Sequence, residues 1–146
     1  MQASGERLTD ELLQQLLVSA TPEAFLTESG IADRSLADYL NQLLDEKGLK
    51  KSEVIRAAGI NGTYGYDCFS GKAANPSRDH AITLALGLRC TLLETQRLLR
   101  TAGVSELWAK VPRDAVIIYG VQHGFTRVQV DDDLYRLGFD TLVKES

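Results

Sequence analysis

The stretch from residue 49 to residue 78 most constrains the fold, because its glycines divide it into segments that can each hold only a short helix. Residues 51–58 are mostly good helix formers with an apolar face. Gly59 can end that helix, because glycine adopts the left-handed conformation without a Cβ clash. Asn61 can cap a second helix, which Gly71 stops. The pattern therefore predicts a helix, a tight turn, a second helix and then a polar loop.

Two short helices around a tight turn are the layout of a helix-turn-helix, whose second helix enters the major groove of DNA. Over about half of the chain, from Leu36 to Gly103, the sequence resembles the Cro and phage-repressor class, often called the xenobiotic-response-element family. It is most similar to a branch of bacterial regulators with a Tyr-x-Tyr-x-x-Phe-Ser-Gly run followed by Pro-Ser-Arg-Asp, which here start at Tyr64 and Pro76. The resemblance implies an all-α, lambda-repressor-like five-helix DNA-binding core with extra N- and C-terminal helices.

The expected DNA contacts lie at the start of each motif helix and in the loop after the second one. The candidate DNA-binding residues are Lys50, Lys51, Ser52, Asn61, Gly62, Thr63, Tyr64, Tyr66, Asp67, Lys72, Asn75, Ser77 and Arg78. Thr63, Tyr64 and Tyr66 come early in the second helix, where side chains meet base edges. The alternative for both tyrosines is packing against the core, more so for Tyr66 than for Tyr64. Asp67 would repel phosphate unless it pairs with a base or a nearby cation.

One departure from the family pattern concerns the crossing of the two motif helices. The family usually has a small residue at the position of Ile55 and a branched aliphatic at the position of Gly65, whereas here the sizes are exchanged. If the two positions face each other, the exchange roughly keeps their summed volume. We therefore expect Ile55 to pack directly against Gly65.

The charge distribution supports a DNA-facing surface, although the net charge is −4. Residues 1–46 carry two basic against nine acidic residues, residues 47–113 carry eleven against five, and residues 114–146 carry three against six. Positive charge is thus confined to the motif and its flank. The candidate phosphate contacts are Lys50, Lys51, Lys72 and Arg78, for which ordinary solvated charge is the alternative.

We expect three regions along the chain: an N-terminal helical extension (1–34), the helix-turn-helix core (35–103) and a C-terminal helical extension (104–146). Apolar spacing and capping residues predict helices over residues 6–19, 22–28, 35–47, 78–86, 92–102, 114–123 and 126–137, with Gly87 ending the fourth. Residues 114–123 and 126–137 contain β-branched residues that would also suit strands. No internal repeat is evident.

The remaining residues indicate no catalytic, metal or membrane function. Cys68 and Cys90 are expected inside helices as buried thiols rather than a disulfide, which suits a reducing cytoplasm. Two cysteines and two scattered histidines lack metal-ligand spacing, and no nucleophile with a base or glycine-rich phosphate loop is present. No cofactor is expected. The N-terminus lacks signal-peptide features, and no apolar run could span a bilayer. Trp108 is expected to be a core or interface anchor.

These observations predict a cytoplasmic, sequence-specific transcriptional regulator, a repressor rather than an enzyme, that binds double-stranded DNA as a homodimer. The expected dimer interface is the apolar segment 115–121 with Tyr135, Leu137 and Phe139 beyond it, together with the leucine-rich helix over residues 6–19. The alternative for these segments is that both only cover the core of a monomer. The alternative is a protein-binding adaptor or antitoxin-like module on the same fold, bound to a protein partner through the acidic extensions, with little DNA binding.

Overall fold

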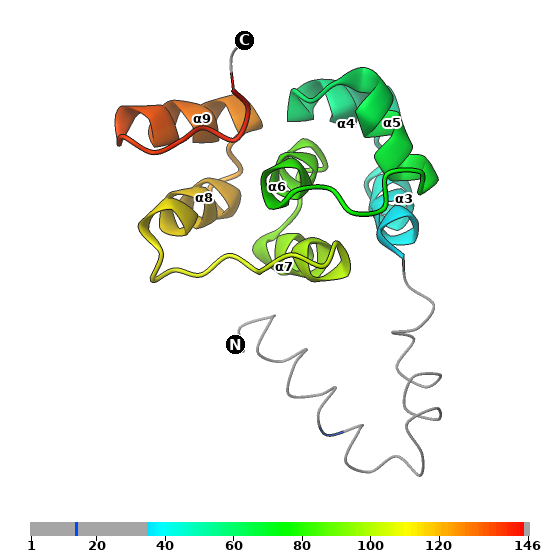
Figure 1. Cartoon of the computed structure of the whole chain (residues 1–146), viewed down its shortest axis with the longest axis horizontal. Coiled ribbons are helices and arrows are strands. Elements are labelled where there is room, and N and C mark those ends of the chain that lie inside the picture. Colours follow the sequence, from blue (N-terminus) through cyan, green and yellow to red (C-terminus); the bar gives the residue numbers. More distant parts are fainter. Residues whose placement is uncertain (1–13, 15–34, 145–146) are drawn as a thin grey trace.

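The computed structural model describes Gln14 and residues 35–144, and within residues 35–144 the secondary structure is entirely helical. The helices are α3 (Leu36–Lys47), α4 (Lys51–Ala58), α5 (Gly62–Ser70), α6 (Arg78–Gly87), α7 (Leu92–Thr101), α8 (Pro112–Gln122) and α9 (Arg127–Arg136) (Figure 1). The all-α prediction is confirmed for this part of the chain. The helices predicted over residues 6–19 and 22–28 lie outside the described residues.

Most predicted helix starts are confirmed by side-chain caps. An oxygen of each capping side chain accepts a hydrogen bond from the backbone N–H three residues on, which satisfies one of the free donors of the first turn. The capping residues are Ser35, Asn61, Ser77, Thr91 and Thr126. Glycines at 48, 59 and 71 take positive φ after α3, α4 and α5, which confirms the predicted helix ends at Gly59 and Gly71.

Two predictions for the turn after α6 are wrong. Gly87 does not stop α6 but is its last helical residue, and the left-handed position is taken by Arg89, with φ of 55°. A residue larger than glycine would not fit at position 87, because a Cβ there would lie 2.6 Å from the carbonyl oxygen of Val54 in α4. Cys90 lies in this turn and not in a helix; both it and Cys68 are buried free thiols.

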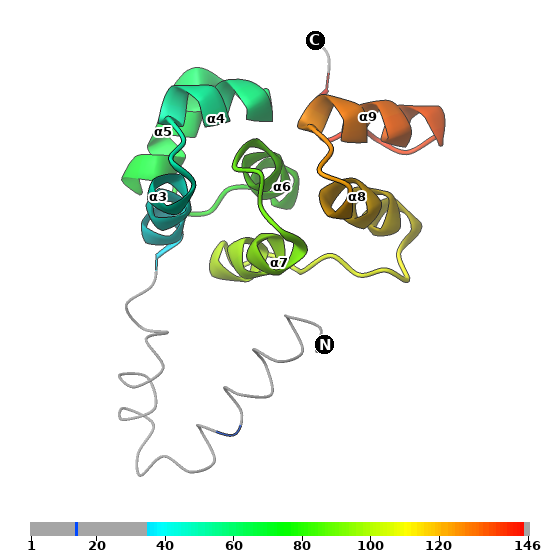
Figure 2. The ribbon, with the colours of Figure 1, turned by 180° about the vertical axis from the view of Figure 1, so that it is seen from behind.

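A continuous apolar core joins all seven helices. Its largest fully buried side chains include Leu40 and Leu43 of α3, Ile82 and Leu84 of α6, Leu98 of α7, Ile117 of α8, and Val130 and Leu134 of α9. Figure 2 shows α6 and α7 in the centre, with α3, α4 and α5 on one side and α8 and α9 on the other. The β-branched residues of α8 and α9 are therefore helical because their apolar faces complete this core.

The four helices α6–α9 form an internal repeat that we did not predict from the sequence. Two helical hairpins, α6–α7 and α8–α9, match at an offset of 35 residues. Equivalent turns are closed by equivalent bonds: the N–H of Cys90 donates to Ala85 O, and the N–H of Phe125 to Gly120 O. The matched pairs with identical residues include Arg78 and Arg113, Asp79 and Asp114, Thr91 and Thr126, and Gly103 and Gly138. The absence of a repeat was therefore a wrong prediction.

The two hairpins are joined by crossed ion pairs. Arg78 of the first hairpin binds Asp114 of the second at 2.7 Å, and Arg113 of the second binds Asp79 of the first at 3.0 Å. Neither ion pair lies within an Arg-Asp dipeptide of the sequence. Because each hairpin supplies one cation and one anion to the other, the starts of α6 and α8 lie side by side.

Candidate nucleic-acid interface

The helix-turn-helix is held at a fixed angle by direct contact between its two helices. An ideal Cβ on Gly65 would lie 2.7 Å from Cγ2 and 2.8 Å from Cγ1 of Ile55, well inside van der Waals distance. The predicted contact between these two positions is therefore confirmed. Asn41 of α3 adds a polar tie, since its amide donates to the carbonyl oxygen of Phe69 at the end of α5 at 2.8 Å.

Most of the candidate DNA-binding residues are exposed to solvent. The exposed candidates are Lys50, Lys51, Ser52, Asn61, Gly62, Thr63, Tyr66, Lys72, Asn75 and Ser77, whereas Tyr64, Asp67 and Arg78 are half-buried. Two of the exposed side chains already have structural roles, because Asn61 caps α5 and Ser77 caps α6. The start of α5 is therefore exposed and polar, and the lysines at the start of α4 and after the end of α5 are exposed as well.

The two tyrosines of α5 differ in the opposite sense to the expectation. Tyr64 packs its ring against that of His80, with centroids 4.9 Å apart, and its hydroxyl bonds to the Cys68 thiol. Burial is the main cause that raises the pKa of Tyr64, with the contact to Cys68 adding to it. Tyr66 instead keeps 48% of its surface exposed. Tyr66 is thus the tyrosine that remains available for an intermolecular contact.

The lysines around the motif carry little internal pairing. Lys51 Nζ lies 5.9 Å from the centroid of the Phe69 ring, and within the described residues neither Lys50 nor Lys72 forms an ion pair. The loop before Lys72 is ordered by Ser70, whose hydroxyl donates to Asp67 O at 3.1 Å and accepts from the Lys72 N–H at 3.3 Å. These ammonium groups therefore remain free for an external anion.

Arg78 differs from the other basic candidates, because all three nitrogens of its guanidinium donate hydrogen bonds inside the chain. It binds both carboxylate oxygens of Asp114 and donates to the carbonyl oxygens of Ser105 and Glu106. Burial by itself raises the pKa of Asp114, but hydrogen bonds from Arg78 and from the Trp108 N–H outweigh it and lower the pKa. The geometry supports a structural role for Arg78 in joining the two hairpins.

The C-terminal tail also reaches the start of α5, which the sequence did not indicate. A hollow of about 410 Å³ has Gly59, Asn61 and Ser77 on one side and Val143 and Lys144 on the other. Asp131 fixes the tail there by accepting from the N–H groups of Leu142 and Val143. Lys144 thus adds an exposed cation beside α5, and its distance of some 80 residues along the chain hid it from sequence reasoning.

Comparison with known proteins does not identify this chain. No protein-family model, no curated protein and no solved structure matches it. None of the described helices is long and apolar enough to cross a membrane. Among the described residues, no group of three or more His, Cys, Asp or Glu side chains is placed to hold a metal ion.

Trp108 does not anchor the core, since it lies in the loop before α8 with 62% of its surface exposed. An interface role for it stays a prediction. Of the predicted dimer segment, Ile117 and Val121 are buried in the core, whereas Tyr119 remains 54% exposed. Tyr135 is 80% exposed and Leu137 49% exposed. The outer surface of the C-terminal hairpin therefore offers several large apolar side chains to solvent.

Proposed function

We propose that this protein is a sequence-specific DNA-binding regulator that presents α5 to the major groove. The observation that carries the proposal is an exposed polar helix start, from Asn61 to Tyr66, together with the exposed Lys50 and Lys72, which form no ion pair within the described residues. Cationic side chains that contact the DNA phosphates position such a protein on DNA, and side chains at the helix start read the bases. The resemblance of residues 36–103 to phage repressors supports a lambda-repressor-like core and a repressor function.

Two-fold dimerisation belongs to the same proposal. A single recognition helix covers few base pairs, so proteins with this motif bind as dimers on half-sites about 34 Å apart. The exposed Val128 and Tyr135 lie seven residues apart on α9 and therefore on one face of that helix. We assign this face to the dimer contact.

A protein-binding adaptor is the second candidate, and the exposed apolar surface of the C-terminal hairpin is what favours it. Trp108 and Tyr135 are large side chains of the kind that anchor protein interfaces. An adaptor would use these residues and leave the lysines of the motif without a partner. The two candidates therefore differ in which surface carries the binding energy.

Fluorescence anisotropy with DNA from upstream of the protein's own gene separates the two candidates. Lys51→Ala and Lys72→Ala should each weaken binding and flatten the dependence of log K on log salt by about one unit. Lys110→Ala is the matched control, because Lys110 is an exposed lysine in the loop between α7 and α8. Unchanged affinity and slope in both motif variants would refute the proposed DNA surface.

A further inference from the structure

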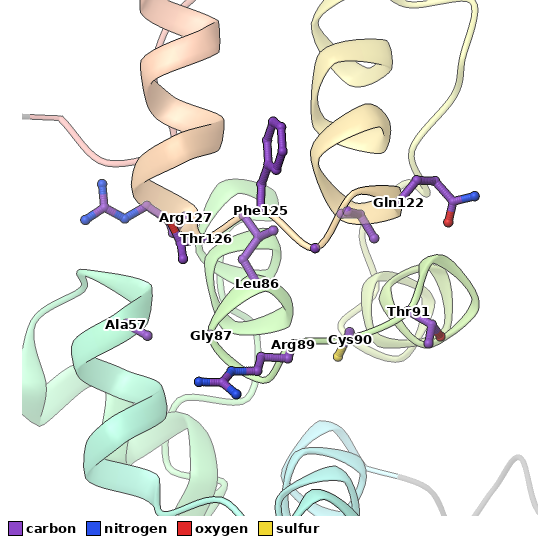
Figure 3. Close-up of a pocket in the computed structure, with 12 residues that line it drawn as sticks. Ala57, Leu86, Gly87, Arg89, Cys90, Thr91, Gln122, Phe125, Thr126 and Arg127 are labelled. Carbon is purple, nitrogen blue, oxygen red and sulfur yellow. The ribbon is translucent and has the colours of Figure 1, made fainter.

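A cavity of about 550 Å³ lies where the helix-turn-helix meets the C-terminal hairpin (Figure 3). Its walls come from Ala57 of α4, Leu86 at the end of α6, and Val121 and Phe125 around the turn between α8 and α9. The volume falls within the range of small-molecule sites, which are mostly apolar with a few polar groups. The cavity is also the place where the turns of both repeat hairpins, 88–91 and 123–126, come together.

The charged side chains of this cavity are both cations. Arg89 and Arg127 line it, and none of the twelve lining residues is acidic. Figure 3 shows both arginine side chains extending toward α4, one from each hairpin. The Arg89 side chain is exposed and forms no hydrogen bond or ion pair within the described chain. A free guanidinium over an apolar wall is a site for an oxyanion.

Arg127 brings a second observation that points to a ligand. Its Nη1 binds Asp131 at 2.9 Å, and its Nη2 lies so close to Gly59 that a Cβ there would be 2.6 Å away. Its Nε is buried and has no hydrogen-bond partner. A buried donor without a partner is costly, and a bound acceptor would remove that cost. Because Asp131 already compensates the charge of Arg127, Arg89 is the uncompensated cation of the two arginines.

The remaining polar surroundings favour negative charge as well. The N-caps of α7 and α9, Thr91 and Thr126, both line the cavity, so two helices begin there. The positive end of a helix dipole favours a negative charge beside it. The Cys90 thiol is neutral, because burial, with a contribution from the charge of Glu94, raises its pKa to about 12. Glu94 itself is paired with Lys47 at 2.9 Å. No unpaired anion among these residues competes with a ligand.

We propose that this cavity binds a small organic anion, a carboxylate or phosphate monoester with an apolar body, whose oxyanion pairs with Arg89 and whose body lies against Leu86, Val121 and Phe125. The carboxylate and the phosphate share the chemistry that a guanidinium recognises, and the experiment below distinguishes them.

The position of the cavity also makes the ligand a regulator, an inference that rests on the proposed DNA-binding function. The ligand would touch α4 of the helix-turn-helix and the hairpin α8–α9 at once, because both line the cavity. A ligand that favours one placement of α4 must change DNA affinity, and DNA must change ligand affinity by the same factor.

Binding is tested on the DNA-free, full-length protein by following amide chemical shifts during titration with phenyl phosphate, benzoate, phenol and inorganic phosphate. We expect phenyl phosphate or benzoate to saturate with shifts in the turns 88–91 and 123–126, and the one that binds identifies the oxyanion. Arg89→Gln should weaken that binding by about tenfold or more. Ala57→Leu, which fills the cavity from an exposed helix position, should abolish it.

Arg97→Gln is the matched control, because Arg97 is an α7 arginine outside the cavity lining, and it should bind as the parent does. If phenol binds as tightly as phenyl phosphate or benzoate, the site does not select an anion, which overturns that part of the proposal. If inorganic phosphate binds as tightly, the site does not select an apolar body, which overturns the other part. Saturation by none of the four probes, or unchanged affinity in Arg89→Gln, would overturn the site itself. If the probe binds but leaves the DNA affinity unchanged, only the regulatory role is wrong; loss of DNA binding without loss of probe binding refutes only the proposed function.

Discussion

The packing of Gly65 against Ile55 predicts that an ordinarily stabilising substitution will destabilise this protein. In a free helix interior, Gly→Ala gains about 1 kcal/mol. Here the added methyl would lie 2.7 and 2.8 Å from two carbons of the buried Ile55 side chain, and real Cβ atoms essentially never make contacts under 3.0 Å. Such overpacking costs about 1–3 kcal/mol, so Gly65→Ala should be net destabilising by up to about 2 kcal/mol.

Substitutions of Ile55 complete a double-mutant cycle with Gly65→Ala, and their effect depends on which atoms of Ile55 make the clash. Ile55→Val removes only Cδ1 and keeps the two atoms at 2.7 and 2.8 Å, so it should not rescue Gly65→Ala. Ile55→Ala removes all three atoms, and alone it should cost about 2–5 kcal/mol as a cavity. Combined with Gly65→Ala, the loss should be smaller than the sum by about 1–3 kcal/mol, because the new methyl occupies part of the cavity.

Urea unfolding of the single and double variants measures this coupling, with unchanged m-values showing that the denatured state is comparable. Gly62→Ala is the control within the same helix, since a Cβ there meets no atom within 4 Å, and it should change stability by no more than about 1 kcal/mol. Additivity of Gly65→Ala and Ile55→Ala within about 0.5 kcal/mol would refute the reasoning. So would a Gly65→Ala variant that is more stable than the parent.

Two further predictions concern the hairpin junction and assembly. Because the folded pKa of Asp114 is lowered, the stability that its ion pair with Arg78 supplies is complete above its unfolded pKa and is lost as pH falls through the lowered value. Asp114→Asn should cost about 3 kcal/mol at neutral pH and flatten the acid limb of stability, because the Asp114 carboxylate is buried. Asp79→Asn should cost under about 1 kcal/mol, because the Asp79 side chain is 36% exposed, and equal losses in the two variants would contradict this. Tyr135→Glu should convert a dimer to a monomer in sedimentation at micromolar concentration, and a parent protein that stays monomeric with and without DNA would remove the dimer.

The helix boundaries of the motif were predictable because their signals are local. A capping side chain such as Asn61 and a left-handed glycine such as Gly59 act on backbone groups within four residues, so the sequence contains both the donor and the acceptor. The contact of Ile55 with Gly65 was predictable for a different reason, since the resemblance to the phage-repressor family implies that these two positions face each other, and their sizes are exchanged relative to the family pattern.

The features that sequence reasoning missed all depend on distant partners. Gly87 looks like a helix stop, but it is small because Val54 of α4 lies against it, while the less suitable Arg89 takes the left-handed turn. Arg78 looks like a phosphate contact, but a carboxylate 36 residues away binds it. The repeat was hidden because only a few matched positions are identical, among them the Arg-Asp pair and the capping threonine, whereas most positions between them differ.

The shared core also decides how assembly can be tested. Ile117, Val130, Leu134 and Leu142 come from the C-terminal region and are all buried in the same core as the helix-turn-helix. A truncation at Lys110 would expose that core and remove Asp114, the partner of Arg78, so it would report on folding before it reported on association. Substitution of an exposed residue such as Tyr135 leaves those contacts in place. Only a surface change of this kind can separate the contribution of α9 to a dimer from its contribution to the stability of the chain.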